Sequence, residues 1–116
     1  MSPEPSYREL RRAKFARRLP DSLADLNGPA HGVVDLPLHV CWSGLCSFDL
    51  DHPKLRMSLY RIVMAEGQRD DLIQFLNRDL LVMLWPVLRT LISRDIRDVW
   101  EGAFTELSTH GKQKAA

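Results

Sequence analysis

Histidine and cysteine side chains gather in one loop-rich stretch, and they are ligand types that zinc prefers. The members of this group are His31, His39, Cys41, Cys46 and His52. The order His-x-Cys-x4-Cys could wrap a metal ion, but it matches none of the common zinc-binding spacings. Cys41 also lies beside Trp42 in an apolar run, which favours a packed thiol. We therefore expect no metal or other cofactor, and the metal candidates to test are His39, Cys41, Cys46 and His52.

Nucleophilic and acid–base catalysis find little support in the residue pattern. Ser43 lacks the glycine-framed turn of a hydrolase nucleophile, and nothing marks Cys41 as an activated thiolate. The carboxylates of Asp70 and Asp71 fit the first turn of a helix, where they complement its dipole. The sequence has no glycine-rich phosphate loop. We expect a protein without catalytic residues, and a metal-dependent or thiol enzyme is the third of three hypotheses.

Basic side chains dominate the first 20 residues, which carry a net charge of +4 against −3 for the remainder of the chain. The basic residues are Arg8, Arg11, Arg12, Lys14, Arg17 and Arg18. Such an arm could contact nucleic-acid phosphates in a salt-sensitive, sequence-independent mode. It could instead pair with carboxylates of an acidic partner or of its own body, since arginine forks bind carboxylates well. The simplest alternative is a solvated basic helix.

A helix over residues 7–18 is predicted to carry this arm. Ser6 and Glu9 fit a capping box, and Pro20 ends the helix. Its apolar residues form a poor stripe, so we expect the helix to fray unless something binds it.

The next stretch is rich in glycine and proline, which exclude a helix. We expect Asp21 to cap a single turn over residues 22–26. Beyond it, extended runs at residues 38–42 and 46–50 predict a small hairpin that lies against the helices.

The remaining elements are helices, and they hold most of the large apolar residues. Asp51 is expected to cap a helix that has Pro53 in its first turn and ends at Gly67. A short helix then begins near Asp70 and breaks at Asn77. The most apolar segment, residues 79–92, predicts a central helix that Pro86 must kink or split. A final helix, capped by Ser93 and reaching Leu107, has apolar residues at i, i+3, i+4 and i+7 spacing.

The tryptophans are mainly expected in the core, because such side chains are usually buried. The segment 79–92 nevertheless has more apolar faces than a small domain can cover, which favours an interface. The residues proposed for contact with a partner are Trp42, Leu45 and Trp85.

The chain is long enough for one domain without a metal or disulfide. We expect a basic arm (residues 1–20), a single helical domain (21–107) and a disordered tail (108–116). No apolar run is long enough for a membrane span, and no secretory signal is visible. A cytoplasmic location, no membrane partner and free thiols at Cys41 and Cys46 are therefore predicted. The expected fold is mainly α: four to five short helices with an extended or hairpin segment at about residues 38–50.

Four segments resemble a group of small helical proteins from actinobacteria. They are HGVVDLPLHVCWSG (31–44), FDLDHPKLRMSLYRIVMAEGQRDDLIQFLN (48–77), LWPVLRTL (84–91) and VWEGAF (99–104). The resemblance covers about residues 20–107 and does not include the basic arm. Some similar proteins are encoded beside nucleotidyltransferase-type toxins, which implies an antitoxin or accessory role. The resemblance brings no catalytic residues with it.

Two main hypotheses of function follow. The first is a non-enzymatic protein-binding module, such as an antitoxin-like inhibitor or adaptor, with a hetero- or homo-oligomeric partner. The second is a small DNA-associated transcriptional regulator whose basic arm binds phosphates. Association that resists salt would favour the first, and nucleic-acid retention that salt abolishes would favour the second.

Overall fold

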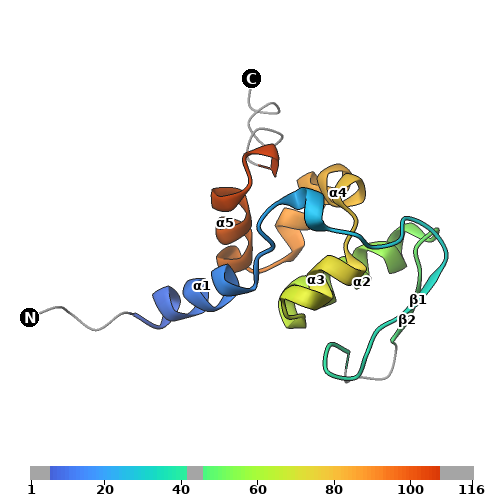
Figure 1. The fold of residues 1–116 in the computed structure, drawn as a ribbon, viewed down its shortest axis with the longest axis horizontal. Coiled ribbons are helices and arrows are strands. Elements are labelled where there is room, and N and C mark those ends of the chain that lie inside the picture. The colour runs from blue at the N-terminus through green and yellow to red at the C-terminus, as the bar shows by residue number, and fades with distance from the viewer. Residues whose placement is uncertain (1–5, 42–45, 108–116) are drawn as a thin grey trace, which may run out of the picture.

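The computed structural model describes residues 6–41 and 46–107, which form short helices and one small hairpin (Figure 1). This architecture confirms the predicted mainly α fold with a small hairpin. In chain order, the elements are α1 (Tyr7–Arg18), the 3₁₀ turn η1 (Leu23–Asp25), β1 (Val33–Asp35), β2 (Ser47–Asp49), α2 (Pro53–Glu66), α3 (Arg69–Phe75), α4 (Arg78–Leu91) and α5 (Arg94–Ala103).

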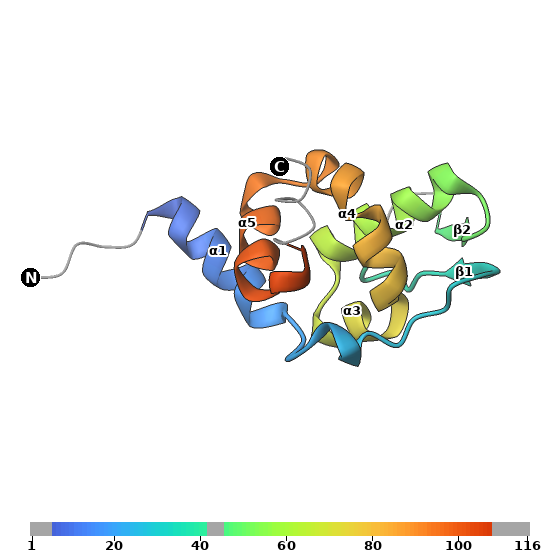
Figure 2. The ribbon, with the colours of Figure 1, turned by 90° about the horizontal axis from the view of Figure 1, so that it is seen from above.

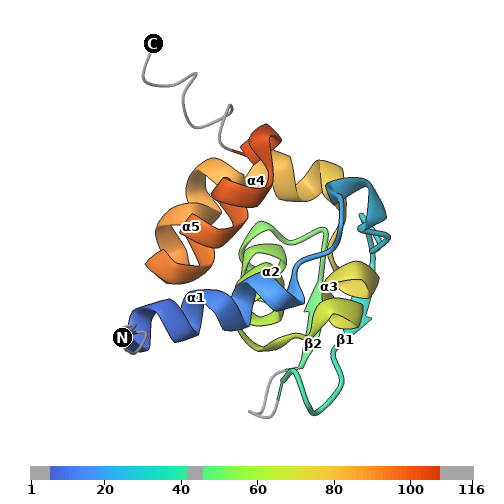
Figure 3. The same cartoon turned by 60° about the vertical axis from the view of Figure 1, so that its left-hand side comes forward.

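Helix α2 lies at the centre of the molecule, with α1, α3, α4 and α5 arranged around it (Figure 3). Its buried residues include Leu59, Tyr60 and Val63, and α4 contributes Trp85 and Leu88. Helix α4 continues through Pro86 as one helix and is not split. Because proline has no N–H, only the hydrogen bond that residue 86 would donate is lost.

Side-chain caps begin three of the helices. Ser6, Asn77 and Ser93 each accept a hydrogen bond from the backbone N–H three residues later, at 3.1, 3.1 and 3.3 Å. The bounds of α1 agree with the sequence prediction, as does the cap of α5. Helix α4 begins one residue earlier than predicted, because the Asn77 side chain occupies the capping position.

Two predicted caps are wrong. Ser22, not Asp21, caps η1: its hydroxyl accepts from the Ala24 N–H, and the Asp25 carboxylate accepts from the Ser22 N–H. His52 precedes α2 without a side-chain cap. The Asp51 carboxylate instead lies 2.9 Å from His31 Nδ1 and accepts from the Gly32 N–H at 3.3 Å.

The first strand of the hairpin lies earlier in the chain than the sequence predicted, whereas the second, β2, lies within the predicted residues 46–50. Strands β1 and β2 are antiparallel, and Val34 pairs with Phe48. The segment predicted as the first strand is a turn from residue 38 to 40, because the carbonyl oxygen of Pro37 accepts hydrogen bonds from Val40 and Cys41. The two strands are therefore Val33–Asp35 and Ser47–Asp49, and they lie side by side below α2 in Figure 1.

A close backbone contact joins η1 to the junction of α3 and α4. The N–H groups of Asn27 and Gly28 donate to the carbonyls of Ile73 and Leu76, both at 2.8 Å. A Cβ atom at Gly28 would lie 2.5 Å from the backbone of Phe75, so only glycine fits this contact.

Candidate functional site: a basic face around helix α1

Helix α1 docks onto α5 through its first half. Arg11 Nε and Arg12 Nε lie 3.1 and 3.3 Å from the Asp95 carboxylate, and Arg12 Nη2 lies 2.6 Å from Asp98. Arg8 adds a longer contact to Asp95, at 3.5 Å. The two helices lie side by side in Figures 1 and 2. The sequence left open whether the arm binds phosphates, binds carboxylates or is solvated. The first half of α1 pairs with carboxylates of its own body.

The arginines change the acidity of the carboxylate that they surround. Burial by itself would raise the pKa of Asp95, but hydrogen bonds from Arg11 and Arg12 and the nearby positive charge outweigh it. The pKa of Asp95 is therefore lowered, and the pair of helices is held by an ionised carboxylate at neutral pH.

Phe15 fixes the position of α1 against the body. Its ring is buried, and three cationic groups lie over it: those of Arg11 and Lys14 at 5.6 Å from the ring centre and that of Arg18 at 5.7 Å. Cations over an aromatic face are attracted by its quadrupole. The ring thus orders the basic side chains on both halves of the helix.

The second half of α1 carries cations without carboxylate partners. Within residues 6–41 and 46–107, no ion pair neutralises Lys14, Arg17 or Arg18. Together with residues at the start of α3 they line an open hollow of about 650 Å³. We call it the basic cradle, and its lining residues are Lys14, Arg17, Arg18, Gln68, Arg69 and Asp70.

A second hollow, of about 540 Å³, lies between α1, α2 and the α4–α5 junction. We call it the groove. Its apolar side chains are Phe15, Ile62, Ala65, Leu91, Ile92 and Ile96, and its polar ones are Arg11, Lys14, Ser58, Arg61, Glu66 and Ser93. Arg11 is paired with Asp95, so Lys14 and Arg61 against Glu66 leave the groove with a modestly positive rim around an apolar floor. Lys14 borders both the groove and the cradle.

An apolar stripe on the outer face of α4 continues from the groove. Met83, Val87 and Leu91 follow i, i+4, i+8 spacing and remain 55%, 56% and 42% exposed. Leu91 also lines the groove, so the stripe and the groove floor form one apolar surface. This surface is the excess of apolar faces that the sequence predicted for residues 79–92.

Trp85 is not part of this surface. Its side chain is fully buried, and its Nε1 atom donates a hydrogen bond of 2.9 Å to Glu101. Arg89 donates to the same carboxylate at 2.7 Å. The proposal of Trp85 as a partner contact is therefore wrong, because its polar atom and its ring are both satisfied within the core. Trp42 and Leu45, the other proposed contacts, lie outside the described residues, as does Ser43.

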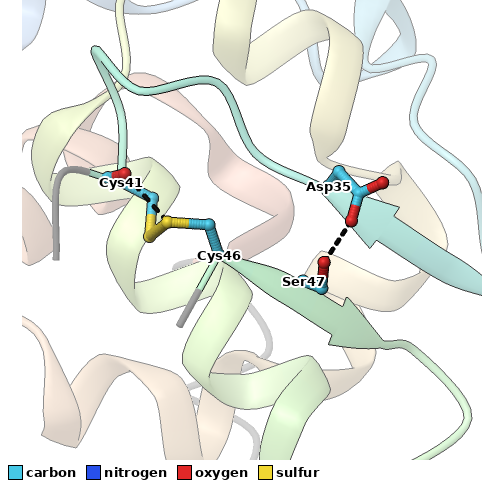
Figure 4. Close-up of a disulfide and its surroundings, with 4 residues drawn as sticks. All are labelled: Asp35, Cys41, Cys46 and Ser47. Atoms are coloured by element: carbon cyan, nitrogen blue, oxygen red, sulfur yellow. Dashed lines mark hydrogen bonds between the residues drawn. A yellow bond between two sulfur atoms is a disulfide. The ribbon is translucent and has the colours of Figure 1, made fainter. Parts of the chain in front are cut away.

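The histidines and cysteines do not converge on one point. Cys41 and Cys46 form a disulfide with their Cα atoms 5.7 Å apart, so the prediction of free thiols is wrong (Figure 4). His39 Nε2 lies 2.9 Å from both carboxylate oxygens of buried Asp71, and the side chain of His52 is exposed at the start of α2. Among the described residues, no group of three or more such side chains is placed to hold a metal ion.

The disulfide joins Cys41, at the end of the Pro37 turn, to Cys46, the residue before β2. Beside it, the Ser47 hydroxyl donates to the Asp35 carboxylate across the β1–β2 pair (Figure 4).

The predicted role of Asp70 and Asp71 in a first helical turn is confirmed. The Asp71 carboxylate accepts from the Gln68 N–H at 2.9 Å, and Asp70 borders the cradle.

Sequence reasoning found the cations of α1 but not those that complete the site. Arg61 and Arg69 come from α2 and α3, about 50 residues later in the chain. One face of α2 combines polar and apolar side chains at i, i+3, i+4 and i+7 spacing: Ser58, Arg61, Ile62 and Ala65. This spacing was the sequence signal for the α2 side of the groove. Its partner helix could not be inferred from that spacing.

None of the helices formed by residues 6–41 and 46–107 is long and apolar enough to cross a lipid bilayer. Comparison of the chain with models of protein families, with characterised proteins and with solved structures finds no match. The resemblance of residues 20–107 to small actinobacterial proteins stays a prediction.

Proposed function

We propose that this chain is a non-enzymatic protein-binding module that accepts an acidic amphipathic helix of a partner protein in the groove. The observation that carries the proposal is the continuous apolar surface formed by the groove floor and the α4 stripe, which Leu91 joins. Exposed apolar surface of this kind is typical of a binding site. An antitoxin-like inhibitor or adaptor would use it to cover part of its target.

The charge of the rim favours an acidic partner. Lys14 and Arg61 face the groove without a carboxylate partner in the described part of the chain, and Glu66 is the one acidic residue of the lining. A helix with apolar residues at i, i+3, i+4 and i+7 could lay that face on the floor. Its carboxylates would then meet the rim, where complementary charge fixes orientation and speeds association.

A tagged chain recovered from its native host tests this proposal. We expect one protein to co-purify at moderate salt, and cross-links from the groove to map onto an acidic amphipathic helix of that protein. Val87→Glu and Ile62→Glu should each abolish recovery, because they place a charge in the apolar surface. Leu38→Glu is the matched control, because Leu38 is an apolar residue that is 80% exposed on the loop before the disulfide.

Two outcomes would contradict the proposal. Recovery that survives both groove variants would place the partner elsewhere on the molecule. A stable dimer of this chain that Val87→Glu dissociates would instead assign the α4 stripe to a second copy. Light scattering of the purified protein, with and without the substitution, distinguishes these outcomes.

A second function, a DNA-associated regulator, is favoured by the unneutralised cations of the second half of α1. The first half is occupied by Asp95 and Asp98, so only a short basic segment would reach phosphates. Nucleic-acid retention that falls steeply with salt and is lost on replacing Arg17 would favour this function. Retention that depends equally on every exposed arginine would count against it.

A further inference from the structure

We propose that the basic cradle binds a small ligand that carries two or more adjacent phosphate groups, such as a diphosphate or triphosphate. The cradle shares Lys14 with the protein-binding groove, but its other five lining residues are its own, and the proposal does not rest on the groove. The four cationic groups come from two helices: Lys14, Arg17 and Arg18 from the end of α1, and Arg69 from the start of α3.

Neutral backbone atoms, rather than carboxylates, hold the guanidinium groups of the cradle. Arg18 Nη1 donates to the carbonyl of Ala65 at 3.5 Å, and Arg69 Nη2 donates to the carbonyl of Arg17 at 3.2 Å. Arg17 Nε donates to the carbonyl of Ala13 at 3.4 Å. Each bond restricts the side chain without cancelling its charge. The cost of ordering these long side chains is thus partly met before a ligand arrives.

The structural alternative is that these arginines cap helix ends, since cations near a helix C-terminus satisfy its last carbonyls. It accounts for Arg18 at the end of α2 and for Arg69 at the end of α1. It uses only one of the five N–H donors that each guanidinium carries. Capping does not apply to Lys14, whose ammonium group lies over the Phe15 ring at 5.6 Å, and it leaves the positive charges gathered around one hollow.

The first half of the same helix shows what a purely structural solution looks like. There, Asp95 and Asp98 neutralise the arginines directly. Among the described residues that line the cradle, Asp70 alone has a carboxylate, and the six lining residues carry a net charge of +3. Four like charges repel one another, and an anion of matching charge would relieve that repulsion.

The charge and the shape of the cradle select the class of anion. A single carboxylate would neutralise one unit of the +3 charge, whereas a terminal phosphate group alone carries about −1.5 to −2 at neutral pH, and each further phosphate group of the chain adds to it. Guanidinium forks also match phosphate oxygens in a bidentate geometry. A nucleic-acid strand presents about one charge per 3.4 Å along its length and needs a row of cations. The row would have to continue along the first half of α1, which Asp95 and Asp98 occupy.

The size of the hollow agrees with such a ligand. Its volume of about 650 Å³ falls within the roughly 300–1,000 Å³ that is typical of small-molecule sites. That space accommodates a group attached to the phosphates as well as the phosphates themselves, so both an inorganic polyphosphate and a nucleotide belong to the class.

Isothermal titration calorimetry with inorganic tripolyphosphate, at roughly 0.15 M ionic strength, tests the proposal on the full chain. We expect saturable binding with one site per chain. Arg17→Gln should weaken it about tenfold, the effect of losing one charge-assisted hydrogen bond, and Arg17→Glu should abolish it. Arg78→Gln and Arg78→Glu are matched controls. Arg78 is an exposed arginine of α4 that lines neither hollow, and its replacement should change the affinity less than twofold.

The arms of the experiment separate the sources of the phosphate groups. A nucleoside triphosphate that binds tighter than tripolyphosphate would show that the attached group is also recognised. Equal affinities for the nucleoside triphosphate and for tripolyphosphate would show that the cradle contacts only the phosphate groups. Absence of saturable binding would overturn the proposal, as would equal weakening by the Arg17 and Arg78 substitutions. If a single-stranded oligonucleotide binds and tripolyphosphate does not, the proposal is overturned and the cradle is assigned to the DNA-associated function instead.

Discussion

Arg12 donates a hydrogen bond of 2.6 Å from its Nη2 atom to the carboxylate of Asp98, 86 residues further along the chain. The same guanidinium contacts Asp95 through Nε at 3.3 Å. One side chain therefore fastens the N-terminal helix α1 to the last helix α5. This contact helps to hold the groove together, since α1 forms one wall and Ile96 of α5 forms part of the floor.

Acid should release α1 from α5. The pKa of Asp95 is lowered in the folded protein, so its ionised form contributes stability that is complete above its unfolded pKa of about 4. That contribution is lost as pH falls through the lowered folded pKa. We expect hydrogen exchange of α1 amides, measured relative to the intrinsic exchange rate at the same pH, to accelerate in this acid range.

The substitution Asp95→Asn should produce the same acceleration at neutral pH and remove its dependence on acid. The control is Asp21→Asn, at an exposed aspartate that takes part in no ion pair within the described residues. If α1 amides exchange equally fast in wild type and Asp95→Asn at neutral pH, the ion pairs do not hold the helix.

Gly28→Ala should destabilise the protein by roughly 3 kcal/mol or more, the range of substitutions that force a backbone contact apart. The added Cβ would lie 2.5 Å from the carbonyl carbon and oxygen of Phe75. Separating those groups would also strain the hydrogen bonds of Asn27 and Gly28 to the α3–α4 junction. The midpoint of urea denaturation measures the loss.

Gly102→Ala is the matched control, because, apart from its chain neighbours and the backbone of α5 itself, no atom of the described residues lies within 4 Å of the Cβ that it would add. An alanine in a helix is about 1 kcal/mol better than glycine, so this variant should be more stable than wild type. Similar destabilisation by both substitutions would contradict the close contact at Gly28.

Local signals in the sequence predicted the helices well. Caps at Ser6 and Ser93 are properties of neighbouring residues, and they placed α1 and the start of α5 correctly, although α5 ends at Ala103 and does not reach Leu107 as predicted. The first strand of the hairpin was misplaced because the Pro37 turn and a three-residue strand, Val33–Asp35, leave no periodic pattern. Contacts between residues that are distant in the chain could not be predicted either, because no local pattern specifies them. Nothing near Arg12 specifies Asp98, so the sequence left the docking of the arm open.

Alkali should destabilise the protein through Tyr60. Its side chain is fully buried, and burial raises its pKa to about 12, against an ordinary value of 10.0. Between these two values the unfolded state releases a proton that the folded state keeps, so stability falls as pH rises. The loss approaches about 2 to 3 kcal/mol at the upper end of this window. Denaturant midpoints measured across it give the slope.

Tyr60→Phe should remove this alkaline slope. It should also cost about 1–3 kcal/mol at neutral pH, because the Asn77 N–H loses the phenol oxygen that accepts its hydrogen bond at 2.9 Å. The difference in stability between wild type and variant should therefore narrow in alkali. A difference that stays constant from neutral pH upward would contradict the burial of an intact phenol at this position.

Reduction of the bond between Cys41 and Cys46 should lower stability by about 2 kcal/mol, the chain-entropy value for so short a loop. The two cysteines are 5 positions apart, and Cys41 is buried in the core at the end of the Pro37 turn. Thermal unfolding with and without a dithiol measures the loss. Cys46→Ser should match the reduced wild type and show no further response to the dithiol. A wild-type unfolding temperature that the dithiol does not change would contradict a stabilising disulfide.

The same bond bears on where the protein acts. A cytoplasmic location was predicted from the absence of a signal segment, whereas disulfides persist in oxidising compartments and are rare in a reducing cytosol. Rapid alkylation of living host cells, followed by mass spectrometry of the chain, distinguishes the two. Blocked thiols on both cysteines would favour the cytoplasmic prediction and would show that the bond is not formed in the cell. Unmodified, bonded cysteines would overturn that prediction, because the pair would then be oxidised where the protein works.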